Sequence, residues 1–181
     1  MDTYKKNYFR FALVLALCLL ARLIPFRAPN VEPILAATMP MGRAFGAFIG
    51  FSFAVLSILL YDALTGTLGV QTFFTVGAYG ALGVWSAGYF RRHAAEKWGY
   101  VRFAIFGTLF FDALTGLTVG PIFFHQSFLG SLTGQIPFTA LHLTSNIVFA
   151  LILSPAIYSF LVKKRKREIE SVANVFKPKT I

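Results

Sequence analysis

The stretch YDALTGTLGVQTFF, residues 61–74, returns almost unchanged as FDALTGLTVGPIFF at residues 111–124. Eight of the twenty positions in residues 61–80 are identical in residues 111–130, at a constant spacing of 50 residues. Each copy ends a long apolar run and carries one of the chain's seven acidic residues, Asp62 or Asp112. If an even number of membrane crossings separates the copies, both lie on the same side of the membrane.

Composition indicates a membrane environment for the whole chain. The 181 residues are 56% hydrophobic and only 13% charged, whereas a soluble domain carries about 25% charged residues. We therefore expect a single transmembrane domain over residues 1–181, in a multi-pass protein of the cell (plasma) membrane. The net charge of +10 comes from short Lys and Arg clusters between apolar runs, which is not the pattern of a nucleic-acid-binding surface.

The first apolar run has two interpretations. Basic residues precede an apolar segment at Phe11–Ala21, which is the order found in a secretory signal peptide. A retained helix is favoured because the rest of the chain is also membrane-like and no clear small-residue cleavage site follows. The single cysteine, Cys18, lies inside this run, so neither an intrachain disulfide nor a cysteine metal cluster is expected.

The apolar runs predict an all-α integral membrane protein, a compact bundle of six transmembrane helices. Residues 31–61 decide the count, since a single helix there would be about 46 Å long with Arg43 near its middle. Two helices separated at Met41–Arg43 fit better. The expected helices cover residues 8–24, 31–42, 43–61, 71–90, 99–116 and 135–162, followed by a basic cytoplasmic tail at 163–181.

Basic residues predict the orientation, because cytoplasmic loops are enriched in Lys and Arg. Six spans with both termini cytoplasmic place fifteen of the seventeen basic residues inside. The alternative of five spans leaves Arg43 within the bilayer, which costs about 2.5 to 3.5 kcal/mol on insertion scales. Both arrangements place the two DALTG segments on the extracytoplasmic side.

The repeated segment has a structural and a functional interpretation. As a helix end, each copy would have its glycine, Gly66 or Gly116, in the left-handed conformation that follows many helices. The aspartates need a further reason, since a carboxylate in the last turn of a helix faces the negative end of the helix dipole. Asp62 and Asp112 either cap a following helix or point into a polar cavity, as ionisable residues at membrane depth commonly do.

Other polar residues of the extracytoplasmic half predict a small-molecule pocket, since such pockets combine apolar and aromatic walls with a few polar groups. His142 and Asn146 lie one helical turn apart, and a hydrogen bond between helices, worth about 0.6 kcal/mol, is the alternative role for them. His125 is expected in a loop over residues 117–134, where a solvated role is the alternative. The candidate substrate-binding residues are Asn30, Asp62, Gln71, Asp112, His125, Gln126, Gln135, His142 and Asn146.

No motif of a metal site or a hydrolase is present, neither HExxH nor Gly-x-Ser-x-Gly. We therefore predict no metal, no cofactor and no enzymatic activity, with an intramembrane enzyme as a remaining alternative. Small residues predict close helix packing at Gly42, Gly46 and Gly50. Ala12 and Ala16 form a similar pair on the first helix, for internal packing or for docking another membrane protein.

These features together resemble the substrate-binding S component of energy-coupling factor (ECF) vitamin transporters. The resemblance covers residues 8–162 and lies in the Ala12/Ala16 pair, the PNVEP loop at residues 29–33 and the two aspartates at outer helix ends. It implies a high-affinity binder of a vitamin-like small molecule, with a lean toward a cobalamin-type ligand. It also implies that Ala12 and Ala16 dock a transmembrane coupling subunit.

The resemblance further implies that ATP-binding-cassette ATPases supply the energy for uptake. This agrees with the absence of a Gly-x-x-x-x-Gly-Lys-Ser/Thr phosphate-binding motif from the chain. A self-sufficient small transporter or channel is the main alternative. Such a carrier is expected to have inverted repeats, whereas the two DALTG segments are predicted on one face of the membrane.

Overall fold

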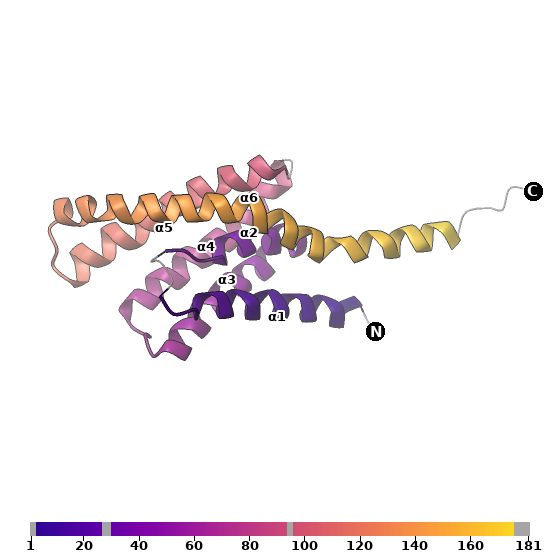
Figure 1. The fold of residues 1–181 in the computed structure, drawn as a ribbon, viewed down its shortest axis with the longest axis horizontal. Coiled ribbons are helices and arrows are strands. Elements are labelled where there is room, and N and C mark those ends of the chain that lie inside the picture. The colour runs from indigo at the N-terminus through magenta and orange to yellow at the C-terminus, as the bar shows by residue number, and fades with distance from the viewer. Residues whose placement is uncertain (1–2, 27–29, 94–95, 176–181) are drawn as a thin grey trace, which may run out of the picture.

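The computed structural model describes residues 3–26, 30–93 and 96–175, and all the regular secondary structure in these residues is helical. The helices pack into one elongated bundle, with α6 projecting beyond it at its C-terminal end (Figure 1). The helices are α1 (Thr3–Arg22), α2 (Ile34–Phe45), α3 (Ala47–Thr65), α4 (Val70–Arg92), α5 (Lys97–Phe123) and α6 (Phe128–Val175).

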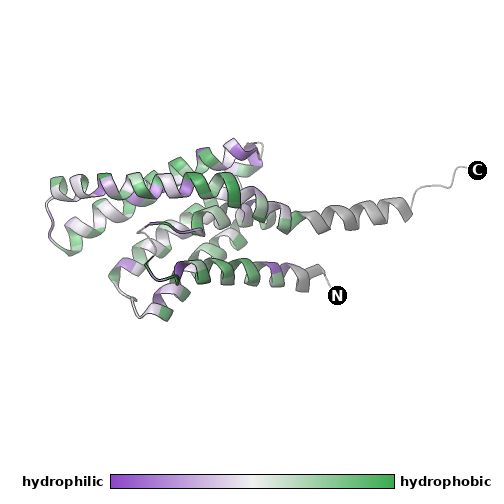
Figure 2. Ribbon diagram, viewed as in Figure 1, coloured by the Kyte–Doolittle hydropathy of each residue, from purple (hydrophilic) through white to green (hydrophobic). Residues whose placement is uncertain are grey.

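Three of these helices are long and apolar enough to cross a membrane: α3, α5 and the Phe128–Val162 part of α6. The outer surface of the bundle carries many large apolar side chains, among them Leu17 at 55% exposure, Phe106 at 59% and Ile152 at 64%. Hydrophobic residues run along the lengths of the helices, and hydrophilic ones gather at the α4–α5 connection (Figure 2). A surface of this kind suits lipid rather than water, and together these features indicate a membrane protein.

Helix α2 forms the centre of the bundle. Every residue from Ile34 to Gly42 is buried, and α2 contacts all five other helices. Because an α-helix rises about 1.5 Å per residue, this twelve-residue helix is much shorter than its neighbours. This position explains why its sequence is mostly apolar, with Thr38 and Arg43 as the polar exceptions, since a helix surrounded on all sides has no solvent-facing side for polar residues.

A sharp reversal at Gly46 separates α2 from α3. Gly46 has a φ of 92°, a conformation that glycine adopts readily and other residues avoid. The reversal brings Gly50 against Gly42, and a Cβ atom at either position would overlap the backbone of Gly83 in α4. The predicted close packing at Gly42 and Gly50 is therefore confirmed, whereas Gly46 makes the turn itself, and the break lies beyond the expected Met41–Arg43.

The predicted loop over residues 117–134 is wrong. Helix α5 continues to Phe123, and α6 begins at Phe128, so only a short connection separates the two. The α5–α6 hairpin lies alongside the rest of the bundle and extends past it at the end opposite the C-terminal projection (Figure 1). His125, expected in a long loop, lies in this short connection with a φ of 51°.

The two ends of the bundle differ in charge. At one end Arg43 donates a hydrogen bond to the Tyr100 hydroxyl at 2.9 Å, and its guanidinium lies 3.6 Å from the centre of the Tyr158 ring. The helix ends at the α4–α5 connection bring Arg91, Arg92 and Lys97 to this same end. The opposite end, where α3 meets α4 and α5 meets α6, contains both DALTG segments.

Candidate ligand-binding site

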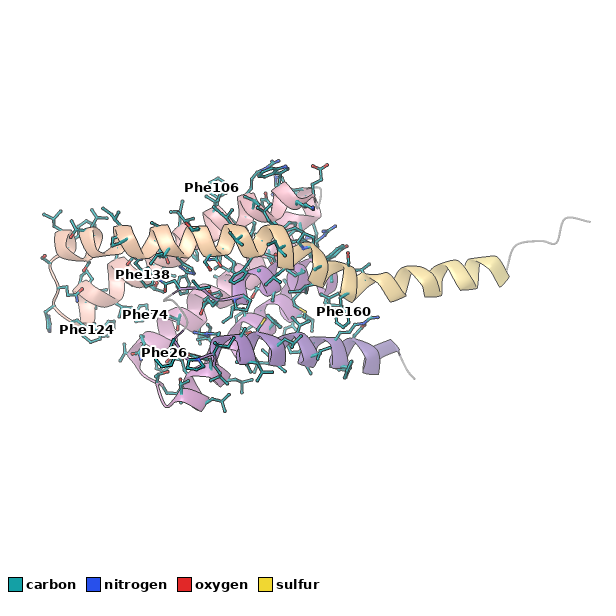
Figure 3. The ribbon with its side chains drawn as sticks, viewed as in Figure 1. Phe26, Phe74, Phe106, Phe124, Phe138 and Phe160 are labelled. Atoms are coloured by element: carbon teal, nitrogen blue, oxygen red, sulfur yellow. The ribbon has the colours of Figure 1, made fainter. Side chains whose placement is uncertain are left out.

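A cavity of about 300 Å³ opens at the end of the bundle that contains the DALTG segments. Five helices and two connections contribute to its wall, so its shape depends on the packing of the whole bundle. The lining residues are Arg22, Asn30, Glu32, Ile58, Asp62, Thr67, Gln71, Thr75, Tyr79, Phe111, Thr115, Phe138 and His142. Phe26, Phe74, Phe124 and Phe138 lie at this end of the molecule, and Phe160 lies at the other (Figure 3).

An ion pair between α1 and the following connection forms one side of the cavity. Arg22 Nε lies 3.0 Å from Glu32 Oε2, and both side chains are almost 90% buried, at 12% and 11% exposure. The Tyr79 hydroxyl donates to Glu32 Oε1 at 2.7 Å, and the guanidinium of Arg22 lies 3.7 Å from the centre of the Tyr61 ring. Because each charge has an opposite charge and a further partner, the pair is compensated within the protein.

Asp62 lies at the end of α3 and is 8% exposed. The Thr72 hydroxyl of α4 donates to Asp62 Oδ2 at 2.7 Å, and Thr72 Oγ1 accepts from the Gly69 amide at 3.2 Å. After Asp62 the chain turns at Gly66, which has a φ of 69°. The Thr67 amide bonds to the Asp62 carbonyl and the Gly66 amide to the Ala63 carbonyl, which together form a Schellman motif. The left-handed conformation predicted for Gly66 is confirmed.

Asp112 lies deeper than Asp62 and pairs with a histidine. Asp112 Oδ1 is 2.7 Å from His142 Nδ1 of α6, and each residue is 2% exposed. We assign the hydrogen to Nδ1, because an ionised carboxylate can only accept. Helix α5 runs straight through Gly116, so the prediction of a left-handed Gly116 is wrong. A Cβ atom there would overlap the side chain of Gln135, so Gly116 serves the close approach of α6.

Several buried polar atoms at the cavity have no hydrogen-bond partner within the described residues. They are Arg22 Nη1, Asn30 Nδ2, His142 Nε2 and Asp112 Oδ2. Arg22 Nε also makes no well-aligned hydrogen bond, but it lies 3.0 Å from Glu32 Oε2 in the ion pair. An unpaired buried polar group costs about 1 to 3 kcal/mol, and most such groups in proteins are satisfied by protein, water or ligand. Donors and acceptors that converge on one cavity indicate a site for a polar molecule.

The structure brings four of the nine candidate residues into the wall of this cavity: Asn30, Asp62, Gln71 and His142. Asp112 supports His142 without lining the cavity. Asn146 lies one turn further along α6 and donates to the Thr108 hydroxyl of α5 at 2.8 Å. Its observed contact is thus a hydrogen bond between helices, the alternative considered for it from the sequence.

The other three candidates lie elsewhere. Gln126 and Gln135 line a second, more open hollow of about 490 Å³ between α5 and α6, together with glycines and serines of the hairpin. Gln126 Oε1 accepts a hydrogen bond from the Ser131 hydroxyl at 3.2 Å. His125 is exposed in the α5–α6 connection, with no contact to the first cavity among its described lining residues.

Six polar residues of the cavity wall were not among the predicted site residues: Arg22, Glu32, Thr67, Thr75, Tyr79 and Thr115. Arg22 was expected at the outer end of the helix over residues 8–24, and Tyr79 was given no role within the helix over residues 71–90. Arg22 is one of only two basic residues assigned to the outer side, and Glu32 follows it across a short connection. An isolated arginine near an isolated glutamate was the available signal, because opposite charges in an apolar setting tend to pair.

Together, the helical bundle, the lipid-suited surface and the buried polar cavity define an integral membrane protein with a candidate site for a small molecule. Within the described residues, no three His, Cys, Asp or Glu side chains come together as a metal site would require. Comparisons with protein-family models, with curated proteins and with solved structures gave no match.

Proposed function

We propose that this chain is a membrane-embedded binding subunit that captures a vitamin-like small molecule on the extracytoplasmic side and passes it to a separate ATP-driven coupling module. The observation that carries the proposal is the cavity at the DALTG end, with its unpartnered Arg22, Asn30 and His142 atoms. A subunit that binds tightly needs buried groups that only a ligand satisfies, and these atoms supply them.

The proposed orientation of the chain in the membrane rests on the distribution of its basic residues. We propose six membrane-embedded helices, with α2 as a short central one and both termini cytoplasmic. Arg43, Arg91, Arg92 and Lys97 lie at the end opposite the cavity, and cytoplasmic ends are the basic ones. The cavity then opens to the outside, where a nutrient arrives.

Labelling in intact cells tests this orientation. In a Cys18→Ser background, His125→Cys lies at the cavity end and Glu96→Cys at the basic end, and both positions are exposed. A membrane-impermeant maleimide is expected to label His125→Cys in intact cells and Glu96→Cys only after permeabilisation. The reverse pattern would contradict the orientation and place the cavity inside.

The volume of the cavity bears on the ligand. About 300 Å³ is at the lower end of the range for small-molecule sites, roughly 300 to 1,000 Å³. A corrinoid is several times larger than this, so the volume favours a ligand of one or two rings over the cobalamin-type ligand suggested by resemblance. The more open hollow between α5 and α6 does not join the first cavity through a common lining residue.

Docking to a coupling subunit is assigned to α1, as the resemblance to ECF S components implies. Ala12 and Ala16 are both exposed on α1, beside the exposed Leu13 and Leu17. A pair of small residues on a lipid-facing surface allows another helix to approach closely.

Bulky substitutions test the docking. Ala12→Trp and Ala16→Trp are expected to block cellular uptake while leaving ligand affinity unchanged. Ala81→Trp, at an exposed alanine of α4, is the matched control and should leave uptake intact. Uptake that survives Trp at both α1 positions would contradict the docking assignment.

Binding itself is tested by native mass spectrometry of the protein purified in mild detergent from cells grown in complete medium. The proposal predicts one small molecule bound per chain, released unchanged on unfolding. Uniform absence of any bound molecule would contradict a high-affinity binding function, and release of a chemically converted product would instead favour an intramembrane enzyme.

A further inference from the structure

We propose that the cavity selects a small organic cation, held by Asp62, that also carries a hydrogen-bond acceptor for Arg22 and Asn30. This inference rests on the proposed binding function and adds the chemical class of the ligand. It comes from the balance of charges around the cavity.

Among the described residues, the lining side chains that can carry a charge near neutral pH are Arg22, Glu32, Asp62 and His142. Arg22 and Glu32 neutralise each other, with Nε and Oε2 3.0 Å apart. Asp62 has no cation within ion-pair distance among the described residues, and only the Thr72 hydroxyl bonds to its carboxylate. A buried carboxylate without a countercharge is unfavourable in a low-dielectric environment, and a cationic ligand would supply the missing charge.

The histidine adds a second acceptor. Because Asp112 takes the hydrogen on Nδ1 at 2.7 Å, the Nε2 atom of a neutral His142 has a free lone pair. This atom is buried, has no partner within the described residues and belongs to a residue that lines the cavity. Asp62 and His142 thus both accept hydrogen bonds, which suits a ligand with N–H groups beside its positive charge.

Aromatic rings form much of the remaining wall, from Tyr79, Phe111 and Phe138. The face of an aromatic ring attracts a cation within about 6 Å of its centre. An anion would instead meet Asp62, which has no countercharge among the described residues, while Arg22, the one arginine among the described lining residues, already pairs with Glu32. The same groups therefore attract a cation and disfavour an anion, which is how a site gains specificity.

Two unpaired hydrogen-bond donors in the cavity indicate a further feature of the ligand. Arg22 Nη1 and Asn30 Nδ2 are buried and without partners among the described residues, and each can only donate. They call for a carbonyl, hydroxyl or ring-nitrogen acceptor on the ligand. With a cavity of about 300 Å³, the class is a flat heteroaromatic or ammonium cation of one or two rings that bears one such acceptor.

The test uses the full-length chain purified from cells in complete medium, and the molecule that copurifies with it. That molecule is released by unfolding, passed over cation- and anion-exchange resins at neutral pH, and quantified per chain. Asp62→Asn removes the charge but keeps an oxygen that accepts from Thr72, and Glu96→Gln removes a charge from an exposed residue at the other end. We expect a cation, with occupancy at least tenfold lower in Asp62→Asn and unchanged in Glu96→Gln.

Each of the other possible results contradicts a particular part of the proposal. A neutral or anionic molecule from the wild-type protein overturns the charge inference and leaves the binding function standing, and this readout does not depend on any variant folding. A cation retained equally by Asp62→Asn overturns the assignment to Asp62. No copurifying molecule in the wild-type protein and in Glu96→Gln contradicts the binding function, and the inference that rests on it.

Discussion

The two DALTG segments have nearly the same sequence but different structures. In the first, α3 ends in a left-handed Gly66 with a φ of 69°, and Asp62 bonds across the turn to Thr72 at 2.7 Å. In the second, α5 continues through Gly116 to Phe123, and Asp112 bonds to His142 on another helix. One copy closes a turn locally, and the other joins two long helices.

The residues that follow the repeated DALTG sequence explain why the two aspartates have different partners. At the constant spacing of 50, Gly69 and Thr72 of the first copy correspond to Val119 and Ile122 of the second. Gly69 precedes the first residue of α4, and Thr72 supplies the hydroxyl for Asp62. Ile122 has no hydroxyl to donate to Asp112, and Asp112 has its partner on α6 instead. The same DALTG sequence thus gives one carboxylate that lines the cavity and one that is bonded to a histidine.

Alanine at each aspartate gives the largest expected difference between the copies. Asp112→Ala leaves the buried Nδ1–H of His142 without its acceptor, which costs up to about 3 kcal/mol. Asp62→Ala leaves only the Thr72 hydroxyl unpaired, at about 1 kcal/mol. The free energy of unfolding in mixed micelles measures both, and equal losses would show that the two carboxylates have equivalent roles.

Replacement of Gly66 and of Gly116 by alanine distinguishes the turn in the first copy from the continuous helix in the second. Gly66→Ala puts a Cβ atom into the left-handed conformation and should cost about 1 to 2 kcal/mol of unfolding free energy. Gly116→Ala gains about 1 kcal/mol of helix propensity and only displaces the flexible end of Gln135. Its stability should therefore change little. A loss at Gly116 as large as that at Gly66 would argue for a turn in both copies.

The smallest effect concerns Thr72 and Ile122. Thr72→Val removes the hydroxyl that bonds to Asp62 and should lower stability by about 1 kcal/mol, whereas Thr72→Ser should retain the bond. Ile122→Val, at a side chain that is 60% exposed, should stay within about 0.5 kcal/mol of the wild-type protein. Thermal unfolding in detergent checks the series, and a Thr72→Val variant as stable as Thr72→Ser would refute the role of the hydroxyl.

Local signals in the sequence predicted part of this structure. The turn at Gly66 and the contacts of Gly42 and Gly50 follow from glycine chemistry, which acts over a few residues. One cavity is lined by Asn30, Asp62, Gln71 and His142. Polar residues at the same end of an apolar bundle avoid its lipid-facing surface, so they are expected to lie close together inside it.

The rest depended on partners distant in sequence. Helix α5 continues through Gly116, where Gln135 of α6 approaches closely, and nothing in the residues around Gly116 reports that contact. The Arg22 side chain points into the bundle because it pairs with Glu32 and stacks on the Tyr61 ring. Tertiary contacts determine such features, and they override the conformational propensity of the local sequence.

An experimental structure of the protein with its copurified molecule tests the central claim most directly. The account predicts the molecule in the cavity lined by α1, α3, α4, α5 and α6, within hydrogen-bond distance of Asp62 and of His142 Nε2, with Asp112 still bonded to His142 Nδ1. A molecule seated instead in the hollow beside Gln126 and Gln135, or one that contacts Asp112 and not Asp62, would contradict it.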